Sequence, residues 1–150
     1  MNLKDAIPAN PYYKQAIADF TLGMPVVKFF GLEFTAIEHG SVELEIPYRD
    51  ELSATQGMLQ GGPVGTLIDL AACAAVGTTL PEGWSFSTID FTVKFTAPAL
   101  GSRFRAKGQV ISMGRTLSVG ESRLFAVEGG EEKLCAVGMA TTRNFPLKPV

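Results

Sequence analysis

The chain has 150 residues, of which 46% are hydrophobic and 19% charged, a composition that suits one folded domain and excludes a disordered chain. Thirteen basic and fifteen acidic residues give a formal net charge of -2, which favours neither nucleic acid nor a membrane surface as a partner. The two cysteines lack metal-ligand spacing, and the single histidine, His39, lies in a predicted surface turn. We therefore expect no metal, no redox cofactor and a cytoplasmic location, with a carboxylate as any catalytic group.

The first third of the chain predicts one short helix and two strands. Apolar side chains recur at helical spacing over residues 11–22, and the sequence Gly-Met-Pro at 23–25 ends that helix. Two short strands follow over 32–38 and 42–47, joined by a turn. In the second strand apolar residues alternate with glutamates, which indicates one buried face and one solvated face.

The middle of the chain predicts a loop followed by an enclosed helix. Residues 48–62 are rich in polar and small residues and indicate a loop, and Pro63 suits the first position of a helix. From there to Gly77 the residues are small or aliphatic on nearly every side. A helix that is apolar all round is one that other elements enclose.

The second half of the chain predicts four strands, over residues 86–96, 102–113, 116–127 and 133–143. Short turns join them, so they should pair antiparallel. Strict alternation in the first of these strands puts Ile89, Phe91, Val93 and Phe95 on one face. An antiparallel sheet of about six strands wrapped around one central helix, with a short N-terminal helix, is an α+β fold.

Asp69 is the one charged residue between Leu52 and Pro81, in the middle of the predicted central helix. No lysine or arginine stands three or four residues away to pair with it, and an unpaired buried carboxylate costs at least several kcal/mol, by order of magnitude. Asp69 therefore needs distant hydrogen-bond donors or a pocket open to water. The residues alone leave open a structural role and a catalytic one.

Four segments together resemble the hotdog-fold thioesterases, in particular the phenylacetyl-CoA thioesterase-like group. They are MPVVKFFGL at 24–32, LQGGPVGTLID at 59–69, TIDFTVKFTAPA at 88–99 and GRTL at 114–117. The resemblance runs from about residue 24 to residue 143. It implies a hotdog domain over 24–150 that follows an N-terminal helical extension over 1–23.

The resemblance implies hydrolysis of an acyl-CoA thioester at a site between two subunits, with CoA as part of the substrate and no other cofactor. In such enzymes a glycine amide at the helix start polarises the thioester carbonyl. An acidic residue eight positions later attacks the carbonyl or activates water. Gly61 and Asp69 occupy these positions, and Thr88 occupies that of an assisting residue from the other subunit.

Substrate-binding roles are assigned to four further residues, Gln56, Gln60, Gly62 and Arg115, the last as a contact for a CoA phosphate. Two positions depart from the family pattern. Gln60 replaces a histidine, and Ala54 replaces an asparagine or glutamine that orients water. Gln56 or Gln60 could take over that role. Arg103, Arg105 and Lys107, which alternate along one strand, are either a solvated face or a contact for nucleotide phosphates.

The resemblance also implies a homodimer, with two dimers forming a homotetramer. Three alternatives stay open: an acyl-CoA-binding protein without catalysis, a hydratase or dehydratase, which the misplaced histidine disfavours, and a purely structural module. Trp84 and Phe86 indicate a hydrophobic acyl pocket but do not separate aryl groups from fatty chains.

Overall fold

The computed structural model describes residue 3 and residues 5–148. Two helices, α1 (Tyr13–Leu22) and α2 (Pro25–Phe30), precede the strands β1 (Glu33–Glu38) and β2 (Ser41–Pro47). A 3-10 turn, η1 (Asp50–Leu52), and two very short strands, β3 (Ser53–Thr55) and β4 (Met58–Leu59), lead to the central helix α3 (Gly61–Gly77). Four long strands complete the chain: β5 (Trp84–Phe95), β6 (Arg103–Ser112), β7 (Leu117–Glu128) and β8 (Glu131–Pro146).

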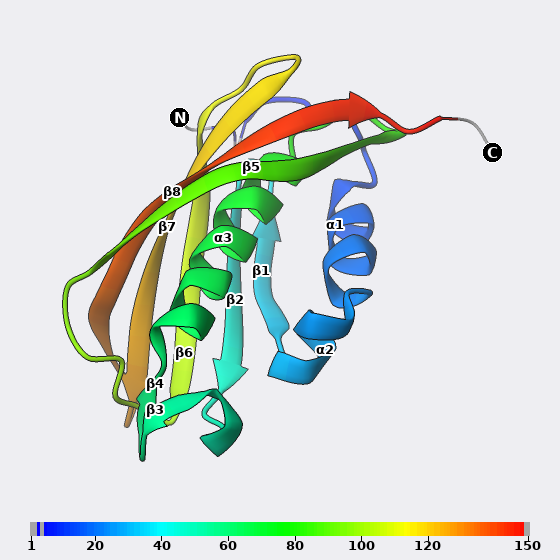
Figure 1. The fold of residues 1–150 in the computed structure, drawn as a ribbon. Coiled ribbons are helices and arrows are strands. Elements are labelled where there is room, and N and C mark those ends of the chain that lie inside the picture. The colour runs from blue at the N-terminus through cyan, green and yellow to red at the C-terminus, as the bar shows by residue number, and fades with distance from the viewer. Residues whose placement is uncertain (1–2, 4, 149–150) are drawn as a thin grey trace.

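Strands β1, β2 and β5–β8 form one antiparallel sheet in the order β1-β2-β6-β7-β8-β5, which curves around α3 (Figure 1). The helix residues Leu67, Ile68, Ala71 and Ala75 are fully buried against it. α1 lies beside α3 and contacts β1 and α2. The predicted α+β architecture, a six-stranded sheet around one enclosed helix, is therefore confirmed.

Two glycines on the inner face of the sheet let α3 approach it closely. A Cβ atom on Gly108 of β6 would lie 2.1 Å from the carbonyl oxygen of Ala71, and one on Gly120 of β7 would lie 2.4 Å from that of Ala72. Real Cβ atoms do not come so near to a backbone oxygen. The helix backbone therefore rests directly on the strand backbones at these two positions.

Three local features differ from the sequence predictions. The segment over 25–30 forms α2, which begins at Pro25 and is capped by Gly31, whose φ is 67°. The predicted loop over 48–62 contains η1, β3, β4 and the first two residues of α3, so Pro63 is the third residue of that helix. His39 is buried, because its ring packs on Tyr13 and lies 3.2 Å from the carbonyl oxygen of Leu3.

A β-bulge in β5 changes which of its side chains face α3. Thr88 pairs with Thr142 and Asp90 with Thr141, so Ile89 is the extra residue. Such a bulge shifts the inward side chains by one position. Phe91 faces α3 on one side of the bulge, and Thr88 faces it on the other. Alternation from Phe91 would have put Thr88 on the opposite face.

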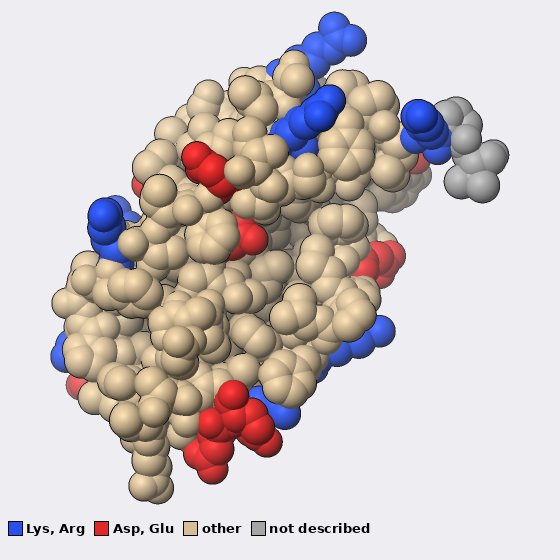
Figure 2. All heavy atoms as spheres, viewed as in Figure 1, with Lys and Arg blue, Asp and Glu red and all other residues tan. Residues whose placement is uncertain are grey.

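β5 is an edge strand of the sheet and exposes large apolar side chains. Ile89, Phe91 and Phe95 are 55%, 47% and 60% exposed. Most of the molecular face over α3 and β5 is uncharged, and the lysines and arginines lie mainly toward its margins (Figure 2). A long apolar edge of this kind is a surface at which another strand can pair.

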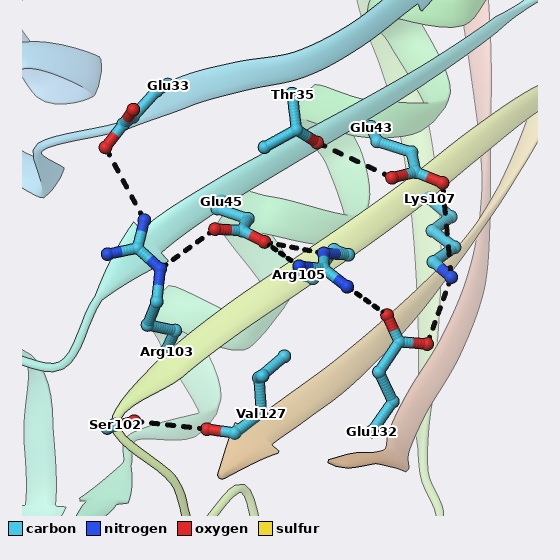
Figure 3. A network of polar contacts seen from close by, with 10 residues as sticks. All are labelled: Glu33, Thr35, Glu43, Glu45, Ser102, Arg103, Arg105, Lys107, Val127 and Glu132. Atoms are coloured by element: carbon cyan, nitrogen blue, oxygen red, sulfur yellow. Dashed lines mark hydrogen bonds and ion pairs between the residues drawn. The ribbon is translucent and has the colours of Figure 1, made fainter. Parts of the chain in front are cut away.

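The basic residues of β6 belong to an ion-pair network on the outer face of the sheet (Figure 3). Arg103 and Arg105 both bind the carboxylate of Glu45, which is only 6% exposed, and Arg105 and Lys107 both bind Glu132. Burial opposes ionisation of Glu45, but the hydrogen bonds from the two arginines outweigh it and hold its pKa below the usual range. This pairing favours a structural role for the three basic residues over contact with nucleotide phosphates.

Among the described residues, no helix has both the length and the hydropathy needed to cross a membrane. The same part of the chain contains no group of three or more His, Cys, Asp or Glu side chains that could hold a metal ion.

Candidate active site

The first turn of α3 leaves one amide without a partner. Gln60 is the N-cap, and its side-chain oxygen accepts a hydrogen bond from the Gly62 amide at 2.6 Å. The Val64 amide donates to the carbonyl oxygen of Gln60, and Pro63 has no N–H. Within the described chain, only the Gly61 amide of this turn has no acceptor. It lies at the positive end of the helix dipole, where an oxygen that gains negative charge is stabilised.

Asp69 lies two turns further along α3 and is held by two side chains. Its Oδ1 atom accepts hydrogen bonds from the Thr88 hydroxyl at 3.0 Å and from the Cys73 thiol at 3.3 Å. Thr88 and Cys73 are themselves 3.3 Å apart. Oδ2 has no hydrogen-bond partner among the described residues, and no lysine or arginine forms an ion pair with Asp69 there. The expected distant donors are therefore present, and one carboxylate oxygen stays available.

Cys73 is a member of this group that the sequence interpretation did not single out. Burial, together with the charge of Asp69, raises the pKa of the Cys73 thiol to about 12. The thiol is therefore neutral at physiological pH and acts as a hydrogen-bond donor to Asp69, not as a nucleophile. The one sequence signal for its contact with Asp69 was its position four residues later in the predicted helix.

Gly61 and Asp69 of one chain are too far apart to contact the same substrate atom. Gly61 is the first residue of α3, and Asp69 follows eight residues later in the same helix. At 1.5 Å of rise per residue this is about 12 Å along the axis. The sequence placed Gly61 in the loop before a helix that begins at Pro63, which is wrong, because the Gln60 cap starts the helix at Gly61. No loop at Gly61 is therefore left to fold back and shorten this distance.

Thr88 reaches Asp69 within one chain, although the resemblance implied a threonine from the other subunit. Thr88, Cys73 and Asp69 therefore form one unit, defined here as the carboxylate cluster. In the single chain Thr88 is exposed, because it lies on the edge strand. The carboxylate cluster thus opens at the uncharged face of the molecule.

The other expected site residues are spread along the molecule. Gln56 lies exposed in the turn between β3 and β4, close in sequence to the start of α3. Ala54 lines an apolar pocket of about 430 Å³ together with Gly61. Arg115 lies exposed in the turn between β6 and β7, beside residues that follow the C-terminal end of α3. The structure therefore brings Gln60 and Gly62 to Gly61 but places Arg115 at the opposite end of the helix.

Comparison with known proteins identifies the class of protein that this fold and site define. The family model of the thioesterase superfamily matches residues 56–133, a range that includes the α3 start and the carboxylate cluster. The chain belongs to the thioesterase superfamily, and its fold is the hotdog fold of that superfamily.

Individual relatives agree with this assignment. A Halobacterium salinarum protein, provisionally named an esterase, is 33% identical over 128 residues, which cover 80% of this chain and 84% of that one. The crystal structure of a thioesterase family protein from Silicibacter pomeroyi has a TM-score of 0.86 at 33% identity and covers 89% of this chain and 98% of that one. A thioesterase of Haemophilus influenzae shares the fold, with a TM-score of 0.79 at 20% identity over 97% of this chain and 96% of its own.

Proposed function

We propose that this protein is an acyl-CoA thioesterase that hydrolyses a CoA thioester to the free acid and CoA. The proposal rests on one observation above all: Oδ1 of Asp69 is held by Thr88 and Cys73, while Oδ2 has no partner among the described residues. A carboxylate oriented in this way can act as a nucleophile or as a general base. The free Gly61 amide supplies the donor that such a reaction needs for the carbonyl oxygen.

Because one chain cannot bring Gly61 and Asp69 together, the proposal includes a homodimer that shares its sites. Two copies of β5 paired antiparallel, about a twofold axis between Phe91 and Thr92, place Thr88 of one chain opposite Phe95 of the other. The Phe95 ring lies 3.4 Å from the position that a Cβ atom on Gly61 would take. The pairing therefore brings the Gly61 amide of one chain toward the carboxylate cluster of the partner subunit, and it covers the exposed apolar edge.

In this arrangement the thioester carbonyl oxygen accepts a hydrogen bond from Gly61, and the carbonyl carbon faces Oδ2 of Asp69 of the partner subunit. By one route Oδ2 attacks that carbon, the C–S bond breaks, and water then hydrolyses the resulting mixed anhydride. By the other route Oδ2 takes a proton from water, which attacks the same carbon. Both routes release CoA, whose thiolate takes up a proton, and the free acid.

The first test is thiol release from a panel of short, medium, long and aryl acyl-CoAs. We expect Asp69→Asn to lower kcat by about 10²- to 10⁴-fold, the range for loss of a general base. Glu128→Gln is the control, since Glu128 is an exposed carboxylate at the end of β7, outside the proposed site and the β5 edge. Undiminished activity in Asp69→Asn would exclude the proposed chemistry.

The shared site is tested by mixing two inactive variants. Gly61→Pro removes the amide N–H and should leave the helix start in place, because proline is tolerated at the first helical position and Gln60 before it is already extended, with a ψ of 153°. Its Cβ atom would lie in contact with the Phe95 ring, at 3.4 Å. A heterodimer of this variant with Asp69→Asn has one intact site and one doubly altered site. With random pairing, co-expression should restore about a quarter of wild-type activity. A site within one chain would give no restoration.

A second candidate function, acyl-CoA binding without hydrolysis, is favoured by Ala54, which offers no polar side chain to a water molecule in the pocket beside Gly61. That function predicts saturable binding of acyl-CoA without thiol release, and Asp69→Asn would leave the binding intact.

A further inference from the structure

A cavity of about 290 Å³ lies between α1 and the start of β5, at the C-terminal end of α3. Its size is close to the lower end of the range for small-molecule sites. Its apolar walls come from three elements: Ala16, Ile17 and Phe20 of α1, Gly77 of α3, and Trp84 and Phe86 of β5. None of these residues has a part in the proposed reaction.

A continuous series of side-chain contacts joins this cavity to the carboxylate cluster. Cys73 touches Asp69, and Phe86 packs against the buried group that contains Cys73. Phe86 in turn meets Phe20 edge to face, with the ring centroids 5.2 Å apart. Asp69, Cys73 and Gly77 all lie on one side of α3, as their spacing of four residues requires. The side chains that link the carboxylate to the cavity, Cys73, Phe86 and Phe20, are therefore apolar.

We propose that this cavity binds the distal part of a straight-chain acyl group of about eight to twelve carbons, with α1 as its outer wall. The inference rests on the proposed thioesterase function and adds its substrate class. Gly77 lies eight residues beyond Asp69, or about 12 Å along the helix. With C–C bonds of about 1.5 Å, an extended chain advances about 1.3 Å per carbon and needs about nine carbons to reach this level. A phenylacetyl group is too short and ends near Cys73.

The charge at the rim supports an acyl chain rather than the CoA arm. Glu82 lines the cavity, and its carboxylate would repel the phosphates of CoA. The pocket beside Gly61, which Ala54 lines, is more open to solvent and suits the exit of the hydrophilic arm. The cavity beside α1 thus receives the acyl chain, and the pocket beside Gly61 receives the CoA arm.

The first experiment compares chain-length profiles. Ala16→Phe fills the cavity from an exposed position of α1, and Gln15→Phe places the same side chain one residue away, outside the cavity lining. Each methylene that leaves water favours binding by roughly fourfold. We expect Ala16→Phe to lower the kcat/KM ratio of decanoyl-CoA to butyryl-CoA by about tenfold or more. Gln15→Phe should leave the ratio within about twofold, the ordinary effect of a surface change.

An unchanged ratio in Ala16→Phe, together with a lowered ratio in Ala54→Phe, would overturn the inference and place the chain in the pocket beside Gly61. The proposed function would survive that result, because wild-type thiol release does not depend on it. Thiol release by wild type from phenylacetyl-CoA alone would likewise overturn the inference and leave the thioesterase function intact.

The second experiment needs no catalysis. Trp84 is the only tryptophan in the chain and lines the cavity, so its fluorescence reports on occupancy. Decyl-CoA thioether, which cannot be hydrolysed, should change this fluorescence saturably in wild type and in Gln15→Phe but not in Ala16→Phe. If wild type released no thiol and this pattern still appeared, the proposed function would fail and the acyl cavity would stand. No change in wild type would refute the cavity, whatever the activity.

Discussion

Replacing Thr88 with valine tests how the carboxylate is held. Valine keeps the shape and β-branching of threonine, so the bulge in β5 should persist, but the variant loses the hydroxyl that donates to Oδ1 of Asp69 at 3.0 Å. A hydrogen bond to a charged group contributes about 1.5 to 3 kcal/mol. Thr88 is exposed in the single chain, and the Cys73 thiol remains as a second donor, so the lower part of this range applies.

At about 1.4 kcal/mol per tenfold in rate, we expect Thr88→Val to lower kcat by about 10- to 30-fold. KM should change little, because Thr88 contacts the carboxylate rather than the substrate, and the melting temperature should stay within a few degrees. Thr88→Ser keeps the hydroxyl and should retain most of the activity. The measurement is steady-state thiol release with a matched thermal melt. Equal activity in Thr88→Val and wild type, or equal loss in the serine and valine variants, would refute this account.

Two further predictions concern stability. The pKa of the Cys73 thiol is raised to about 12 in the folded state. The thiol therefore contributes stability that is fully present below its unfolded pKa. This stability is lost as the pH rises above about 9, at about 1.4 kcal/mol per pH unit. Urea unfolding between pH 8 and pH 11 should show this decline in wild type relative to Cys73→Ala, and parallel curves would contradict it. Glu45→Gln should cost about 1 to 3 kcal/mol at pH 7, because it removes the charge between two arginines. The folded pKa of Glu45 is lowered, so that stability is present above the unfolded pKa and is lost as the pH falls through the folded value. A difference from wild type that does not shrink as the pH is lowered from 7 would count against it.

Periodicity predicted the main elements, because hydrophobic pattern and turn chemistry are local signals. The long strands and α3 lie within a few residues of the predicted ranges. It could not predict the bulge at Ile89, since an extra residue leaves no mark in the sequence of one strand. The start of α3 was also missed, because Gln60 caps the helix through its side chain, whereas the usual capping residues are Ser, Thr, Asp and Asn.

The candidate site was predictable only in part. Asp69 stands out as a lone charge, and the resemblance pointed to Gly61 and Thr88. The partners of the basic residues of β6 were not predictable, because Glu45 lies 58 residues from Arg103 in the chain and meets it only through the pairing of β2 with β6. The role of Cys73 likewise depends on a strand 15 residues away that carries Thr88.

The contact of α3 with Gly108 and Gly120 limits which parts of the molecule can change between related proteins. With backbone against backbone, the axis of the helix cannot shift without a clash, so the sheet holds in place both the free amide at the helix start and the carboxylate two turns on. The reaction chemistry is thus built into the least adjustable part of the molecule. Selectivity for one substrate over another is left to the periphery, where α1 and the β3–β4 turn can change length and side chains without moving the reacting groups.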